Sequence, residues 1–91
     1  MIARLLAISG RVQGVGYRDW LVRQAVRRGL RGWVRNRPDR SVQALVAGDA
    51  AAVQAMIAAC RRGPLLARVT AIMEAPAEPP EEPGFSRRAD G

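Results

Sequence analysis

Residues 2–30 read IARLLAISGRVQGVGYRDWLVRQAVRRGL, and the hydrophobic period changes once along this stretch. Residues 2–9 are a nearly continuous apolar run with one arginine, which is typical of a strand covered on at least one face. Three glycines then interrupt the run, and from Tyr17 the apolar residues recur at helical spacing. The stretch therefore predicts a strand, a glycine-rich loop and a helix that ends near Gly29, a residue suited to the left-handed position after a helix.

The next part of the chain predicts a β-hairpin followed by a second helix. A strand is expected over residues 30–36, a turn at Pro38–Arg40, and a second strand over residues 41–47 with alternating apolar positions. Asp49 is a suitable N-cap for a helix whose apolar residues share one face, namely Val53, Met56, Ile57 and Cys60. The Arg-Arg-Gly-Pro sequence at 61–64 is expected to end this helix.

A fourth strand is expected near residues 69–73, and Phe85 is expected to anchor a short last strand. Between them, residues 75–84 are rich in Pro and Glu and predict an irregular segment. The order strand, helix, strand, strand, helix, strand is the βαββαβ arrangement of ferredoxin-like folds. The expected class is therefore α+β, a split βαβ sandwich with two helices on one face of a four- or five-stranded antiparallel sheet, and residues 1–91 form one domain.

In this arrangement the first two strands run parallel and the third lies between them. The loop after the first strand and Asn36 at the end of the second are therefore expected at the same edge of the sheet. About twenty residues separate them along the chain. We expect these two distant segments to form one site.

The composition is that of a folded protein with unusually few catalytic side-chain types. The 91 residues are 48% hydrophobic and 25% charged, with one cysteine and no histidine. The absence of histidine excludes Ser-His and Cys-His nucleophilic pairs and His-ligated metals, and without a Cys and His cluster no zinc site is expected. The lone Cys60 predicts a buried core thiol. No signal peptide or apolar membrane span is evident from Met1 onward, so a cytoplasmic protein without a membrane partner is expected.

The net charge of +7 comes from 15 basic residues, all of them arginine. Such a charge suits an anionic partner, including RNA, and ferredoxin-like domains do include RNA-binding modules. The arginines are scattered along the chain, however, and the strand at 41–47 lacks the aromatic residues on which such modules stack bases. A nucleic-acid partner is therefore not expected.

The loop from Gly10 to Arg18, GRVQGVGYR, has the ingredients of a phosphate site. Glycines allow successive backbone N–H groups to turn inward, and the following helix N-terminus adds its dipole. Arg18 adds a permanent, bidentate positive charge. The loop is neither a Walker A motif nor a dinucleotide fingerprint. On spacing alone, a simple tight turn with a solvated Arg18 is the favoured interpretation.

The residue identities favour the phosphate site. GRVQGVGYR resembles the acylphosphatase signature G-x-V-Q-G-V-x-[FY]-R, and GWVRN at 32–36 resembles the second signature of that family, G-[FYW]-[AV]-[KRQ]-N. The resemblance implies a metal-independent hydrolase of acyl phosphates without a cofactor, in which Arg18 binds the phosphate and Asn36 orients the water. The backbone amides of the loop are implied as further phosphate ligands, from Val12, Gln13, Gly14, Val15, Gly16 and Tyr17.

The same resemblance sets expectations for ligands and assembly. Inorganic phosphate or sulfate is expected to bind the same loop, and the chain is expected to be a monomer. Some acylphosphatase-like domains are parts of larger maturation enzymes, which leaves a phosphate-binding module without turnover as the alternative. With no further domain in the 91 residues, a free-standing enzyme is favoured.

Two positions depart from the family pattern. Arg40 stands where a glycine commonly completes the turn after the asparagine, and Arg28 stands where an aliphatic residue commonly packs under the helix. A left-handed arginine costs about 1 kcal/mol or more. We therefore expect Pro38 and Asp39 to impose a different turn type at this position.

Overall fold

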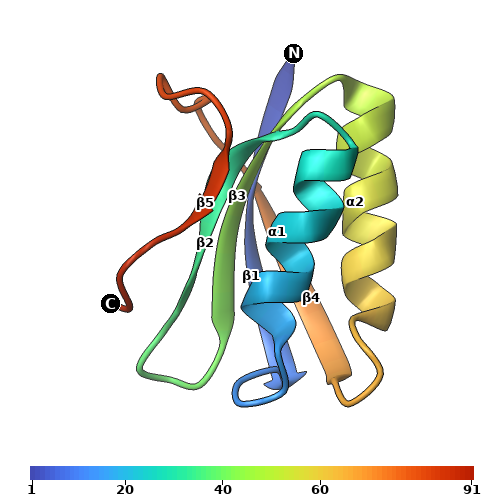
Figure 1. The fold of residues 1–91 in the computed structure, drawn as a ribbon, viewed down its shortest axis with the longest axis vertical. Coiled ribbons are helices and arrows are strands. Elements are labelled where there is room, and N and C mark those ends of the chain that lie inside the picture. Colours follow the sequence, from blue (N-terminus) through green and yellow to red (C-terminus); the bar gives the residue numbers. More distant parts are fainter.

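The computed structural model describes residues 1–91 and places two helices on one face of a five-stranded sheet (Figure 1). The order of the strands across the sheet is β4-β1-β3-β2-β5. This confirms the ferredoxin-like α+β prediction. The elements are β1 (Ile2–Arg11), α1 (Tyr17–Arg27), β2 (Arg31–Asn36), β3 (Val42–Gly48), α2 (Ala50–Arg62), β4 (Arg68–Pro76) and β5 (Phe85–Arg87).

The strand β5 makes the only parallel pairing of the sheet. It lies beside β2 with Gly32 opposite Phe85 and Val34 opposite Arg87, whereas β1, β2, β3 and β4 pair antiparallel. The chain reaches this edge from β4 through residues 77–84, which are held by the Arg31 guanidinium. Its Nη2 donates to the carbonyls of Pro80 at 2.7 Å and Glu81 at 2.9 Å. The last strand therefore starts at the same end as β2 and follows it in the same direction.

The helix ends follow the local signals of the sequence. The left-handed Gly29 has a φ of 66°, and the N–H groups of Gly29 and Leu30 donate to the carbonyls of Val26 and Ala25. This is the Schellman pattern that ends a helix. At the start of α2, the Asp49 carboxylate accepts from the N–H groups at 51 and 52, as predicted for an N-cap.

The main core lies between the sheet and the two helices. Leu6, Leu21 and Met56 are fully buried there, together with the Tyr17 ring. The Tyr17 hydroxyl donates to the Cys60 carbonyl at 2.7 Å and so ties the start of α1 to the end of α2. Cys60 is buried, as predicted, and this burial raises the pKa of its thiol to about 11.

The fourth strand is longer than the sequence predicts. It extends to Pro76, because Ala75 and Pro76 pair with Leu5 and Arg4 of β1. Pro76 is tolerated because β4 is an edge strand, where a missing N–H on the outer side breaks no ladder bond. The irregular segment therefore spans 77–84 rather than 75–84.

The expectation for Arg40 is wrong. It adopts the left-handed conformation with a φ of 74°, the only non-glycine residue to do so. The turn is held by the Asp39 carboxylate, which accepts from the Ser41 N–H at 2.9 Å and the Ser41 hydroxyl at 2.6 Å. These hydrogen bonds lower the pKa of Asp39. They stabilise the turn type that a glycine suits best, and the arginine bears the strain. At the other departure, Arg28 folds back on its own helix and donates to the Gln24 carbonyl and side chain.

Replacing Arg40 by glycine is expected to stabilise the protein. Glycine removes the steric cost of the left-handed conformation, which exceeds the backbone entropy that glycine adds to the unfolded chain. The free energy of unfolding should rise by about 0.5–1 kcal/mol, measured by urea denaturation. Arg37→Gly serves as the control, because Arg37 has no positive φ, and it should lose stability. A lower stability for Arg40→Gly would contradict this account of the turn.

Candidate active site

The fold brings the two predicted segments together. The glycine loop between β1 and α1 lies beside the β2–β3 turn, and the side chain of Gln13 joins them. Its Nε2 donates to the Arg37 carbonyl at 3.0 Å and to the Ser41 carbonyl at 2.9 Å. Gln13, which the sequence suggested as a backbone ligand, thus also fixes the loop relative to the end of β2.

The loop has the conformation of an anion-binding cradle. Gly14 and Gly16 are left-handed, with φ of 74° and 77°. Gly16 is the N-cap of α1 and no side chain caps the helix, so the amides of its first turn face no internal side-chain acceptor. The backbone N–H groups of residues 12–16 donate to no protein carbonyl. Unpaired amides together with the positive end of the helix dipole favour an anion at this position.

The side chains that flank the loop are anchored in the core. Val12 and Tyr17 are 1% exposed, at the two ends of the glycine turn. Burial raises the pKa of the Tyr17 hydroxyl, so this group acts as a hydrogen-bond donor to the Cys60 carbonyl and not as an acid or base near neutral pH. Val15, which is partly buried, also packs against the core. The loop is therefore rigidly placed by apolar contacts on both sides.

Arg18 and Asn36 meet at a single carboxylate oxygen. Arg18 is the second residue of α1, and its Nη1 lies 3.0 Å from Asp90 Oδ1. The same oxygen accepts from the backbone N–H of Asn36 at 3.2 Å. The structure thus brings the two predicted catalytic residues to one place at the sheet edge, where an oxygen anion already accepts from both.

The side chain of Asn36 is unusual in another respect. Its Oδ1 atom is buried and has no hydrogen-bond partner within the protein. Buried acceptors without a partner are rare, since leaving one unpaired costs about 1–3 kcal/mol. No hydrogen bond within the protein therefore occupies this acceptor.

A small cavity of about 80 Å³ lies against the loop. Arg18 and the loop glycines line it, and so do two residues that the sequence did not suggest, Asp19 and Arg87. Arg87 Nη1 lies 2.8 Å from Asp19 Oδ1. A larger hollow of about 310 Å³ lies on the sheet face away from the helices, beside Trp33 and Arg88. Neither the loop nor Arg18 lines this larger hollow. The smaller cavity, which they do line, is therefore the better candidate for the site.

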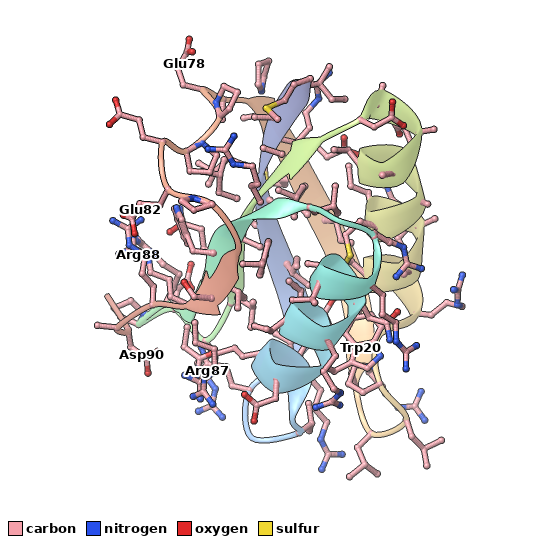
Figure 2. The ribbon with its side chains drawn as sticks, turned by 45° about the horizontal axis from the view of Figure 1, so that its top comes forward. Trp20, Glu78, Glu82, Arg87, Arg88 and Asp90 are labelled. Atoms are coloured by element: carbon pink, nitrogen blue, oxygen red, sulfur yellow. The ribbon has the colours of Figure 1, made fainter.

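Sequence reasoning missed Asp19, Arg87 and Asp90. Figure 2 shows Arg87 and Asp90 close together, on the side of the molecule where α1 begins. The ion pair of Arg87 with Asp19 spans 68 positions of the chain, and that of Asp90 with Arg18 spans 72. The only signal in the sequence is the apolar Phe85, which predicts a last strand without indicating its neighbour.

The structure also bears on metal and membrane binding. It contains no group of three or more His, Cys, Asp or Glu side chains that could hold a metal ion. Neither helix is long and apolar enough to cross a bilayer.

A ferredoxin-like sheet with an uncapped helix, a glycine loop and an arginine beside it defines a small α+β protein with a candidate anion site. The family model described as Acylphosphatase matches residues 5–87. The chain belongs to the acylphosphatase family.

Individual relatives agree with this assignment. An acylphosphatase of Acidiphilium cryptum (strain JF-5) is 64% identical over 91 residues, which is 100% of each chain. The crystal structure of acylphosphatase from Bacillus subtilis has a TM-score of 0.91 at 35% identity and covers 97% of this chain and 99% of that one. Full-length HypF, in its phosphate- and nucleotide-bound form, matches with a TM-score of 0.89 at 27% identity, over 98% of this chain and 12% of its own.

These comparisons confirm the predicted family, fold and activity. The protein is a hydrolase of acyl phosphates, the mixed anhydrides of a carboxylic acid and phosphoric acid.

Proposed function

We propose that the Gly10–Arg18 loop holds the phosphate of the acyl phosphate, and that Asn36 orients the attacking water. The observation that carries the proposal is the position of Asp90 Oδ1, which accepts from Arg18 at 3.0 Å and from Asn36 N at 3.2 Å. This carboxylate oxygen stands in for a phosphate oxygen. It supports a single anion site that includes both segments.

The chemistry needs little more than placement and charge. The leaving carboxylate has a conjugate acid with a pKa of about 4, so it departs without a general acid. Phosphoryl transfer passes through a loose transition state with negative charge on the peripheral oxygens. The free loop amides and Arg18 stabilise that charge in fixed positions. This explains why a protein without histidine can catalyse the reaction.

No hydrogen bond within the protein occupies Asn36 Oδ1, which supports its part of the proposal; in the substrate complex the side chain turns this covered atom toward the site. This atom accepts a hydrogen bond from the attacking water and aims the water in line with the leaving oxygen. A carboxamide is too weak a base to remove the proton. A phosphate oxygen of the substrate takes it instead, so the residue contributes orientation only.

Release of inorganic phosphate from benzoyl phosphate, by the wild-type protein and by Arg18→Ala and Asn36→Ala variants, tests both roles. Rapid turnover by the wild-type protein and its loss in both variants is the expected result. Unchanged turnover in either variant contradicts the role assigned to that residue.

We also infer that the protein acts as a cytoplasmic monomer, and that inorganic phosphate or sulfate binds the same loop. The single, buried Cys60 supports a reducing compartment, because it leaves no internal disulfide to form. A free amide cradle accepts any small tetrahedral anion. Light scattering checks the assembly, with a mass near 9.9 kDa expected; twice that mass would contradict the monomer.

A further inference from the structure

The segment after β5 carries a carboxylate into the anion site. Asp90 Oδ1 lies 3.0 Å from Arg18 Nη1 and 3.2 Å from the backbone nitrogen of Asn36. These donors belong to the two residues assigned to phosphate binding and water orientation. No other acidic side chain contacts either of them.

Backbone hydrogen bonds on both sides of Asp90 place its carboxylate at this position. Beyond Arg87 the chain continues along β2: the Arg88 N–H donates to the Val34 carbonyl at 2.8 Å, and the Gly91 N–H donates to the Asn36 carbonyl at 3.1 Å. The regular pairing of β5 with β2 ends at Arg87, and these two hydrogen bonds hold the chain beyond it against the end of β2. Asp90 lies between these two hydrogen bonds.

We propose that Asp90 is a built-in competitor for the phosphate position on Arg18 and so sets the affinity of the enzyme for its substrate. The proposal rests on the phosphate-binding role of Arg18 given above. A carboxylate oxygen and a phosphate oxygen accept from the same guanidinium and amide donors. The carboxylate and the phosphate repel each other when both lie at contact distance from Arg18. The Asp90 carboxylate must therefore leave before the phosphate can reach its final position.

The exposure of the pair makes this displacement feasible. The Asp90 side chain is 58% exposed and that of Arg18 is 26% exposed. Water replaces the hydrogen bonds of the released carboxylate, and exposed ion pairs contribute little to stability. The competition is therefore weak enough to permit turnover while still lowering the affinity. We expect a factor of about two to five.

An opposite role for Asp90 makes the opposite prediction. If the carboxylate instead held Arg18 in its productive position, its removal would raise the Michaelis constant and weaken phosphate binding. The direction of the change in affinity therefore separates a competitor from a positioning residue.

The test compares Asp90→Asn and Asp90→Ala with the wild-type protein. We expect KM for benzoyl phosphate, and Kd for inorganic phosphate from a chemical-shift titration, to fall by about two- to fivefold, with a much smaller change in kcat. Glu74→Gln is the matched control. Glu74 is also an ion-paired carboxylate, 3.5 Å from Arg61, but it lies on the far edge strand β4. The Glu74→Gln substitution removes the same charge as Asp90→Asn and should leave KM and Kd unchanged.

Unchanged or weakened phosphate binding in both Asp90 variants overturns the proposal. The Kd of Arg18→Ala, with and without Asp90→Asn, separates this result from a failure of the proposed function. Wild-type phosphate affinity in Arg18→Ala removes the role of Arg18 itself. If Arg18→Ala weakens phosphate binding but the Asp90 variants do not tighten it, only the proposal that Asp90 competes with phosphate is rejected. When both proposals hold, Asp90→Asn has a smaller effect on affinity in the Arg18→Ala background, where Asp90 still competes for the Asn36 N–H.

Discussion

Arg18→Ala is expected to lower kcat/KM for benzoyl phosphate by about 10³-fold or more, with effects on both KM and kcat. In its proposed role the guanidinium binds the phosphate in the ground state and neutralises the charge that spreads over the peripheral oxygens in the loose transition state. The side chain is only 26% exposed, so its charge is less screened than that of a fully exposed arginine. Release of inorganic phosphate at varied substrate concentration measures both constants.

Two further variants show whether charge or geometry matters at this position. Arg18→Lys keeps the charge but loses the bidentate fork, so it should recover only part of the lost activity. Arg23→Ala removes the same charge from an exposed position on the same helix and should leave kcat/KM nearly unchanged. Equal losses in Arg18→Ala and Arg23→Ala would show that only the net charge of the protein matters.

Asn36→Ala is expected to lower kcat by about 10² to 10³, with little change in KM. Its proposed contact is with the attacking water and not with the bound phosphate. The Asn36 backbone N–H, which contacts the anion position, survives the substitution. The affinity for inorganic phosphate should therefore be retained. A variant with wild-type kcat would remove the water-orienting role.

Stability measurements separate this catalytic role from a structural one. Because Asn36 Oδ1 is buried without a partner, alanine removes an unpaired acceptor and should not lower the free energy of unfolding. Sites kept for catalysis often carry such a cost. Gln43→Ala is a suitable comparison, because the Gln43 side chain accepts from Arg35 Nε at 2.8 Å on the neighbouring strand. It should lose some stability while retaining kcat.

Local pattern was sufficient to predict most of the fold and to propose the centre of the candidate site. The change from a strand period to a helix period at Tyr17 depends only on neighbouring residues, and so do Gly29 after α1 and the Asp49 cap of α2. The glycine loop and Arg18 are contiguous in the chain, which is why the signature that they match could be recognised in the sequence. Asn36 needed one further step, because its approach to the loop follows from the handedness of the βαβ crossover.

The turn at Arg40 shows how a local rule can fail. The cost of a left-handed arginine is real, but it is small beside the hydrogen bonds that Asp39 and Ser41 make across the turn. Propensity is a weak preference, and the surrounding contacts override it. Sequence alone does not reveal which of two competing local terms is larger.

The rim of the site was beyond the reach of the sequence. The Asp90 contact with Arg18 and the Arg87 contact with Asp19 each span about seventy residues. Both depend on β5 pairing in parallel with β2, in the register that sets Arg87 opposite Val34. A three-residue strand carries too few apolar positions to specify its neighbour or its register. The identities of the phosphate loop and of Asn36 could thus be read from the chain itself, whereas the carboxylate that meets them is placed only by a long-range strand pairing.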